Sequence, residues 1–124
     1  WRGSDRAGNE GSRSLLIRVG GRSVLLSGDA EGDGLAQMLH RNYLSDRCSE
    51  PLRLLLFPHH GSDTDQLGQL LANTQPAEIW ISCSGTPAVL AEVERRGIPC
   101  RTTAKAGALA REMRGVGTAD GRAP

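Results

Sequence analysis

Two short motifs place metal-ligand residue types directly after apolar runs. The first reads LLSGD and ends at Asp29, and the second reads LLLFPHHGS and contains His59 and His60. A strand that stops at such residues presents a carboxylate or an imidazole at the edge of a sheet, where a rigid backbone fixes its position. Hydrolytic metal sites are built in this way. The motifs therefore predict part of a metal site, although they supply fewer ligands than a complete one.

Each motif also has a plainer interpretation. Asp29 follows Gly28 and precedes further glycines, which is typical of an ordinary turn. Adjacent side chains in extended backbone point to opposite sides, so one of His59 and His60 can face a given metal. The other would contact substrate or support the loop. Gly61 permits close backbone approach or a positive φ.

The composition limits the class of protein. The chain has 124 residues, enough for one domain, and its net charge of +1 gives no electrostatic argument for nucleic acid. It contains no apolar run long enough to span a membrane. Cys48, Cys83 and Cys100 show no CxxC spacing, which predicts free thiols in a reducing compartment. A start at Trp1 without a signal peptide predicts a piece of a longer protein.

The hydrophobic pattern predicts the elements that position these motifs. Strands are expected over residues 14–19, 22–27, 52–57, 78–83 and 98–103, with a two-residue hairpin at Gly20-Gly21. Helices are expected over residues 34–43, from a cap at 62–64 to 73, and from a cap at Thr86-Pro87 to just before Gly97. The order β-β-α-β-α-β-α-β indicates an α/β sheet. Residues 1–13 read as a loop. No G-x-G-x-x-G opens a helix after a strand, which argues against a small Rossmann- or flavodoxin-like domain.

Taken in order, the Gly-Gly hairpin, LLSGD and PHHGS resemble the C-terminal half of the metallo-β-lactamase superfamily. The likeness is greatest to the hydrolase-like domain of ComEC-type DNA-uptake (competence) proteins and to its free-standing relatives, over roughly residues 9–110. It implies the C-terminal half of an αββα sandwich, with a partial domain over residues 1–110 and a flexible tail over 111–124. It also implies that Asp29 bridges two metal ions, zinc or alternatively manganese. His59, directly after the strand and Pro58, would be the next ligand, and His60 a catalytic, substrate-facing residue.

The resemblance implies a metal-dependent hydrolase that acts on phosphodiester or other ester bonds, with nucleic acid as a possible substrate. The expected partners are the missing N-terminal half and a fused membrane channel domain. The protein would be cytoplasmic if free-standing and membrane-associated if fused. However, the chain lacks the superfamily's His-x-His-x-Asp-His motif, and SCSGTP at 82–87 replaces the usual Asn…Gly-His-Pro segment. The chain alone is therefore expected to be inactive. The alternative is a non-catalytic, degenerate half-domain that serves as an interaction module of a DNA-uptake or membrane protein.

Overall fold

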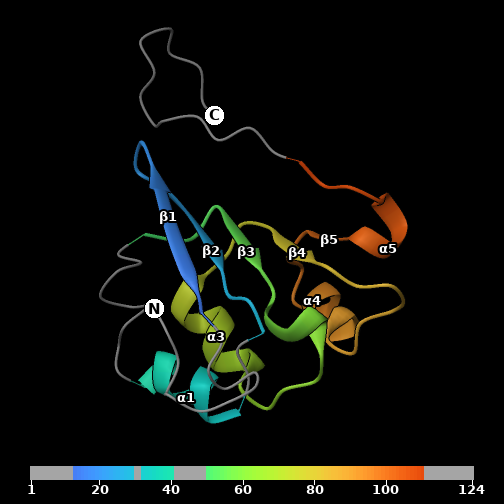
Figure 1. Ribbon diagram of the computed structural model, residues 1–124, viewed down its shortest axis with the longest axis horizontal. Helices are drawn as coiled ribbons and strands as arrows, with labels where there is room; N and C mark the ends of the chain where they lie inside the picture. The colour runs from blue at the N-terminus through green and yellow to red at the C-terminus, as the bar shows by residue number, and fades with distance from the viewer. Residues whose placement is uncertain (1–12, 30–31, 41–49, 111–124) are drawn as a thin grey trace, which may run out of the picture.

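The chain folds into a mixed α/β arrangement around one five-stranded sheet (Figure 1). The computed structural model describes residues 13–29, 32–40 and 50–110. The strands lie in the order β1-β2-β3-β4-β5; β1 is antiparallel to β2, and the other neighbours are parallel. The α/β class and the predicted order of the main elements are therefore confirmed. The second sheet of an αββα sandwich is not among the described residues.

The described strands and helices are short. The strands are β1 Leu15–Val19, β2 Arg22–Leu26, β3 Leu54–Leu56, β4 Ile79–Ile81 and β5 Cys100–Thr102. The helices are α1 Gly32–His40, the 3-10 turn η2 Pro58–Gly61, α3 Leu67–Thr74, α4 Leu90–Arg95 and α5 Thr103–Ala106.

The first two strands form the expected hairpin. Val19 lies opposite Arg22, so Gly20 and Gly21 alone make the turn, with φ angles of 52° and 81°. Two consecutive positive φ angles are what a two-residue hairpin of this twist requires, and glycine adopts them without steric cost.

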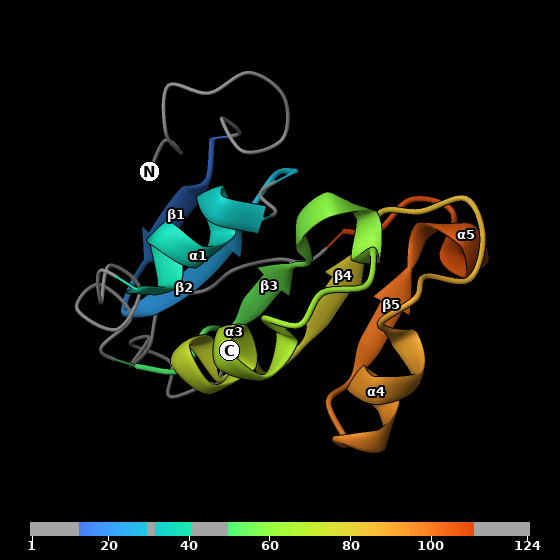
Figure 2. The ribbon, with the colours of Figure 1, turned by 90° about the horizontal axis from the view of Figure 1, so that it is seen from below.

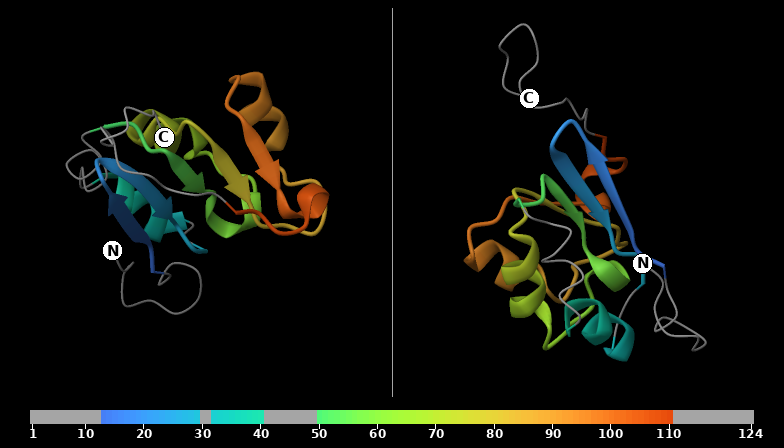
Figure 3. Two further views of the ribbon diagram at one scale, coloured as in Figure 1. Left: turned by 90° about the horizontal axis from the view of Figure 1, so that it is seen from above. Right: turned by 90° about the vertical axis from the view of Figure 1, so that its left-hand side faces the viewer.

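The helices between the parallel strands lie on one face of the sheet. Each crossover moves one strand further in the same direction, and right-handed crossovers that never reverse stay on the same side. Figures 2 and 3 show α1, α3 and α4 together on that side. The core fills the space between these helices and the sheet. Its buried members include Leu35, Met38, Leu39, Leu67, Leu70, Leu71 and Val93 of the helices, packed with Leu25, Leu55, Ile79 and Ile81 of the strands.

The other face of the sheet carries apolar side chains that are exposed along β1. Leu15, Ile17 and Val19 share this face, because side chains alternate along a strand, and they are 56%, 38% and 40% exposed. The strand register adds four residues to the same face, of which Leu26 and Leu56 are half-buried and Val24 and Leu54 are buried. We call this surface the open face. Its exposed part, along β1, is an apolar strip of the kind that marks a docking site.

Two predicted helix starts are wrong. Residues 62–64 do not cap α3, which begins at Leu67; the Thr64 hydroxyl instead accepts a hydrogen bond from the Gln66 backbone N–H at 3.2 Å. This local side-chain bond competes with helix formation. Thr86 and Pro87 likewise precede α4, which begins at Leu90, because this segment packs against η2.

Several predictions fall on residues outside the described ranges. These are the loop over residues 1–12, the end of the first helix at 41–43, Cys48 and the tail over 111–124. Among the described helices, none is long and apolar enough to cross a membrane.

Candidate functional site

Asp29 is held at the carboxyl edge of the sheet by a buried serine. Ser27 is 0% exposed, and its hydroxyl donates a hydrogen bond to the Leu56 carbonyl of the neighbouring strand. The Ser27 carbonyl in turn accepts a hydrogen bond from the Ser14 hydroxyl at 3.0 Å. The ends of three strands are thereby tied together just before Asp29, so its carboxylate starts from a fixed backbone.

The histidine motif forms a left-handed turn. His59 has φ 48° and ψ 47°, His60 has φ 53° and ψ 26°, and Gly61 follows with φ 76°. The extended backbone expected for the two histidines is therefore wrong. Left-handed geometry costs a residue with a Cβ about 1–2 kcal/mol. Such backbone strain is concentrated at functional sites, where the surrounding structure holds it in place.

Two contacts hold this turn. The His59 backbone N–H donates to the Gly28 carbonyl at 3.0 Å, which joins the two motifs directly. On the other side, Gly61 packs so tightly that a Cβ on it would lie 2.7 Å from Pro87 Cβ and 2.8 Å from Ile81 Cγ2. The predicted need for glycine at this position is confirmed, both by its φ and by this close approach.

His60 is the imidazole that meets Asp29. Its Nε2 lies 3.2 Å from Asp29 Oδ1, and its Nδ1 lies 2.8 Å from the Ser82 carbonyl oxygen. The ring thus places Nδ1 against the carbonyl and directs Nε2 at the carboxylate. Metal-binding histidines are commonly oriented in this way, with the second ring nitrogen donating to a backbone carbonyl. The side chains of His60 and Asp29 are 61% and 45% exposed and are therefore open to solvent.

His59 lies beside His60 in the same turn. Its ring centroid lies 6.5 Å from that of His60, with the planes tilted by 52°. The backbone of His59 is thus at the same sheet edge as Asp29, as expected, but the contact that the structure shows to Asp29 comes from His60. Which imidazole ligates a metal stays a prediction.

The described residues do not complete a zinc site. Among residues 13–29, 32–40 and 50–110, no group of three or more His, Cys, Asp or Glu side chains is close enough to hold a metal ion. Asp29 and His60 supply two groups of the right chemistry, whereas a catalytic zinc takes three protein ligands. The pair therefore fits part of the ligand set of a metal centre and does not complete it.

The loop between β4 and α4 forms the other wall of the site. This placement was not predicted from the sequence. The sequence feature that could have indicated it is the SCSGTP segment, because its hydroxyl residues follow a strand end as Asp29 and His59 do. The Cys83 N–H donates to Thr103 Oγ1 at 2.9 Å, and the Thr103 hydroxyl donates back to the Cys83 carbonyl at 3.0 Å. This reciprocal pair fixes the loop next to Ser82 and therefore next to His60.

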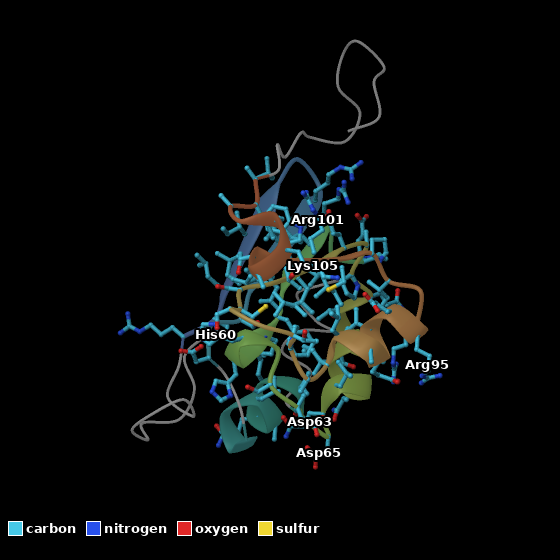
Figure 4. All side chains as sticks on the ribbon, turned by 90° about the vertical axis from the view of Figure 1, so that its right-hand side faces the viewer. His60, Asp63, Asp65, Arg95, Arg101 and Lys105 are labelled. Carbon is cyan, nitrogen blue, oxygen red and sulfur yellow. The ribbon has the colours of Figure 1, made fainter. Side chains whose placement is uncertain are left out.

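An open cavity of about 740 Å³ lies between η2 and this loop. It is lined by residues 60–63 and 82–88, so it begins at His60. Figure 4 shows Arg95, Arg101 and Lys105 apart from His60, and none of these three lines the cavity. The described part of the lining therefore mixes polar and apolar groups and places no lysine or arginine beside the Asp29–His60 pair.

The two described cysteines are free thiols, as predicted. Cys100 packs against the core, and burial raises its pKa to about 11, which keeps the thiol protonated and unreactive. Cys83 also contacts the core, and its Sγ lies 3.3 Å from the Gly85 carbonyl oxygen.

Comparison with family models, with curated proteins and with solved structures finds no match to this chain. What the site can do therefore has to be inferred from its own residues and geometry.

Proposed function

We propose that this chain is part of a metal-dependent hydrolase of the metallo-β-lactamase superfamily, similar to ComEC-type domains. It would act on phosphodiester or other ester bonds, with nucleic acid as one candidate substrate. The observation that carries the proposal is the contact between His60 Nε2 and Asp29 Oδ1, formed at the carboxyl ends of adjacent parallel strands. The described chain contributes this pair, and further ligands would come from a missing N-terminal half of the same domain.

The roles follow from where the groups lie. Asp29, fixed through Ser27, would hold metal with its carboxylate. His60, oriented by the Ser82 carbonyl, would ligate metal through Nε2 or act on substrate, and His59 is the alternative ligand. Bound zinc, or manganese, would polarise the ester and lower the pKa of a bound water.

The open face supports the proposed second half. Helices cover one side of the sheet, while the exposed Leu15, Ile17 and Val19 mark an apolar side that a second sheet could bury. Two sheets packed face to face with helices outside form the αββα sandwich. A fused membrane channel domain would be a further partner of the whole protein.

Zinc binding by the 124-residue chain tests the metal role. We expect weak binding, measured by competition with a chromogenic chelator, that is lost in Asp29→Asn. Asp65→Asn is the matched control, because Asp65 is an exposed carboxylate outside the pair. His59→Ala and His60→Ala identify the ligating imidazole. Zinc binding that Asp29→Asn leaves unchanged would refute the assignment.

Hydrolysis is tested separately. The chain alone should not cleave a chromogenic phosphodiester, because two ligands position a metal poorly. Addition of an N-terminal half that carries His-x-His-x-Asp-His should restore metal-dependent cleavage.

The second candidate is a non-catalytic interaction module. Two observations favour it: the described residues supply two of the three ligands that a catalytic zinc takes, and the open face is apolar. A chain that docks its complementary half and forms no zinc site in the complex would be such a module.

A further inference from the structure

The cavity beside the Asp29–His60 pair has a chemistry of its own. With a volume of about 740 Å³, it is far larger than a metal ion or a water needs and falls within the range of small-molecule sites. It extends from His60 along the β4–α4 loop as far as Ala88. The proposed hydrolase activity accounts for its His60 end and leaves the remainder without a role.

Hydroxyl groups are the most frequent polar side chains of the lining. Ser62, Ser82, Ser84 and Thr86 are exposed residues on the cavity wall. A Cβ added to Gly85 would meet nothing within 4 Å, so a ligand can reach the backbone there. Hydroxyls both donate and accept hydrogen bonds, which suits a ligand that does the same.

The side chains of the lining argue against a phosphate and against an apolar ligand. Among the described residues, its ionisable side chains other than the Cys83 thiol are His60 and Asp63, and no described lysine or arginine lines it. A phosphate usually requires arginine or lysine, or a longer helix N-terminus than the six-residue α4 provides. An apolar ligand would leave the wall hydroxyls without partners.

We propose that this cavity binds the sugar ring of a sugar-containing ester, with the scissile bond directed to the Asp29–His60 pair. The direction of the scissile bond rests on the proposed hydrolase function, whereas the binding of the sugar ring does not. The wall is already ordered, because His60 contacts Ser82 and Thr103 bonds Cys83 on both sides. A preformed wall lowers the entropic cost of binding.

Amide chemical shifts of the isotope-labelled 124-residue chain test the proposal without metal or turnover. The probes are methyl β-ribofuranoside, methyl β-glucopyranoside and inorganic phosphate, each added in the presence of chelator. We expect at least one of the two sugars to shift the Ser82, Ser84, Gly85 and Thr86 amides saturably. The response to ribofuranoside against glucopyranoside separates a nucleoside sugar from a hexose.

Removing two wall hydroxyls gives the second arm. Ser84→Ala combined with Thr86→Val should weaken sugar binding at least about fivefold, the factor for loss of one net hydrogen bond. Ser23→Ala removes a hydroxyl outside the cavity and should leave binding unchanged. Phosphate shifting these amides while neither sugar does so, or saturating sugar leaving them unmoved, would overturn the proposal. Sugar binding that persists in Asp29→Asn, whatever happens to zinc, separates this proposal from the hydrolase function.

Discussion

Gly61 offers a quantitative test of how the histidine turn is held. Its φ of +76° and the 2.7 Å and 2.8 Å contacts that a Cβ would make should each destabilise an alanine there. The left-handed φ costs about 1–2 kcal/mol. Overpacking against Pro87 and Ile81 adds about 1–3 kcal/mol. Gly61→Ala should therefore lower the free energy of unfolding by about 2–5 kcal/mol, a large part of a small domain's stability.

Two other glycines separate these effects. Gly97 has φ +73° and open space around its Cβ position, so Gly97→Ala should cost only the φ contribution of about 1–2 kcal/mol. Gly85 has neither a positive φ nor a neighbour within 4 Å, so Gly85→Ala should lie within about 0.5 kcal/mol of the parent. Urea unfolding followed by circular dichroism measures all three.

A further variant keeps the test informative if Gly61→Ala does not fold. Pro87→Gly removes the Cβ at 2.7 Å, so the double variant should regain part of the lost stability through a favourable coupling energy. The reasoning is refuted if Gly61→Ala and Gly97→Ala unfold at the same urea concentration. In that case η2 would not pack against the β4–α4 loop as closely as described.

Three further predictions concern the rest of the fold. Ser27→Ala should lower the free energy of unfolding by about 1–3 kcal/mol in urea, because the partly buried Leu56 carbonyl loses a donor; a change below about 0.5 kcal/mol would contradict this. Cys100 should react with iodoacetamide at pH 8 roughly a hundredfold more slowly than a thiol of pKa 9, because its folded pKa of about 11 lowers the thiolate fraction. Because the thiol ionises at lower pH in the unfolded chain than in the folded one, it also makes the free energy of unfolding fall as pH rises above about 9. Equal reactivity of Cys100 before and after denaturation would contradict the raised pKa. Ile17→Lys should reduce self-association of the isolated chain in sedimentation while leaving the unfolding midpoint nearly unchanged, because Ile17 lies on the open face; unchanged association would show that this face is not what self-associates.

The sequence predicted the sheet well because its signals are local. Apolar runs flanked by glycine, and the Gly20-Gly21 turn, depend on residues close together in the chain, and so does the spacing of Leu35, Met38 and Leu39. The helix starts failed where tertiary contacts replaced the local cap. Pro87 packs against Gly61, a residue remote in sequence, and α4 begins only after that contact.

The sequence indicated which residues form the candidate site, but it did not indicate which imidazole faces Asp29. Asp29, His59 and His60 were recognised as strand-end groups, and the sheet does bring them to one edge. That His60 contacts Asp29 depends on a left-handed turn, which requires bonds to Gly28 and Ser82 that no local pattern reveals. The cavity along the β4–α4 loop was missed for the same reason.

The Gly20-Gly21 hairpin lies at the rim of the sheet opposite the site. Because the parallel strands all run toward Asp29 and His60, the turn before β2 is the part of the hairpin most remote from the chemistry, yet β1 beside it belongs to the open face. Turns of this kind tolerate inserted residues. A fluorophore or a fused reporter placed there would report arrival of a second layer on the sheet without altering any group that touches metal or substrate.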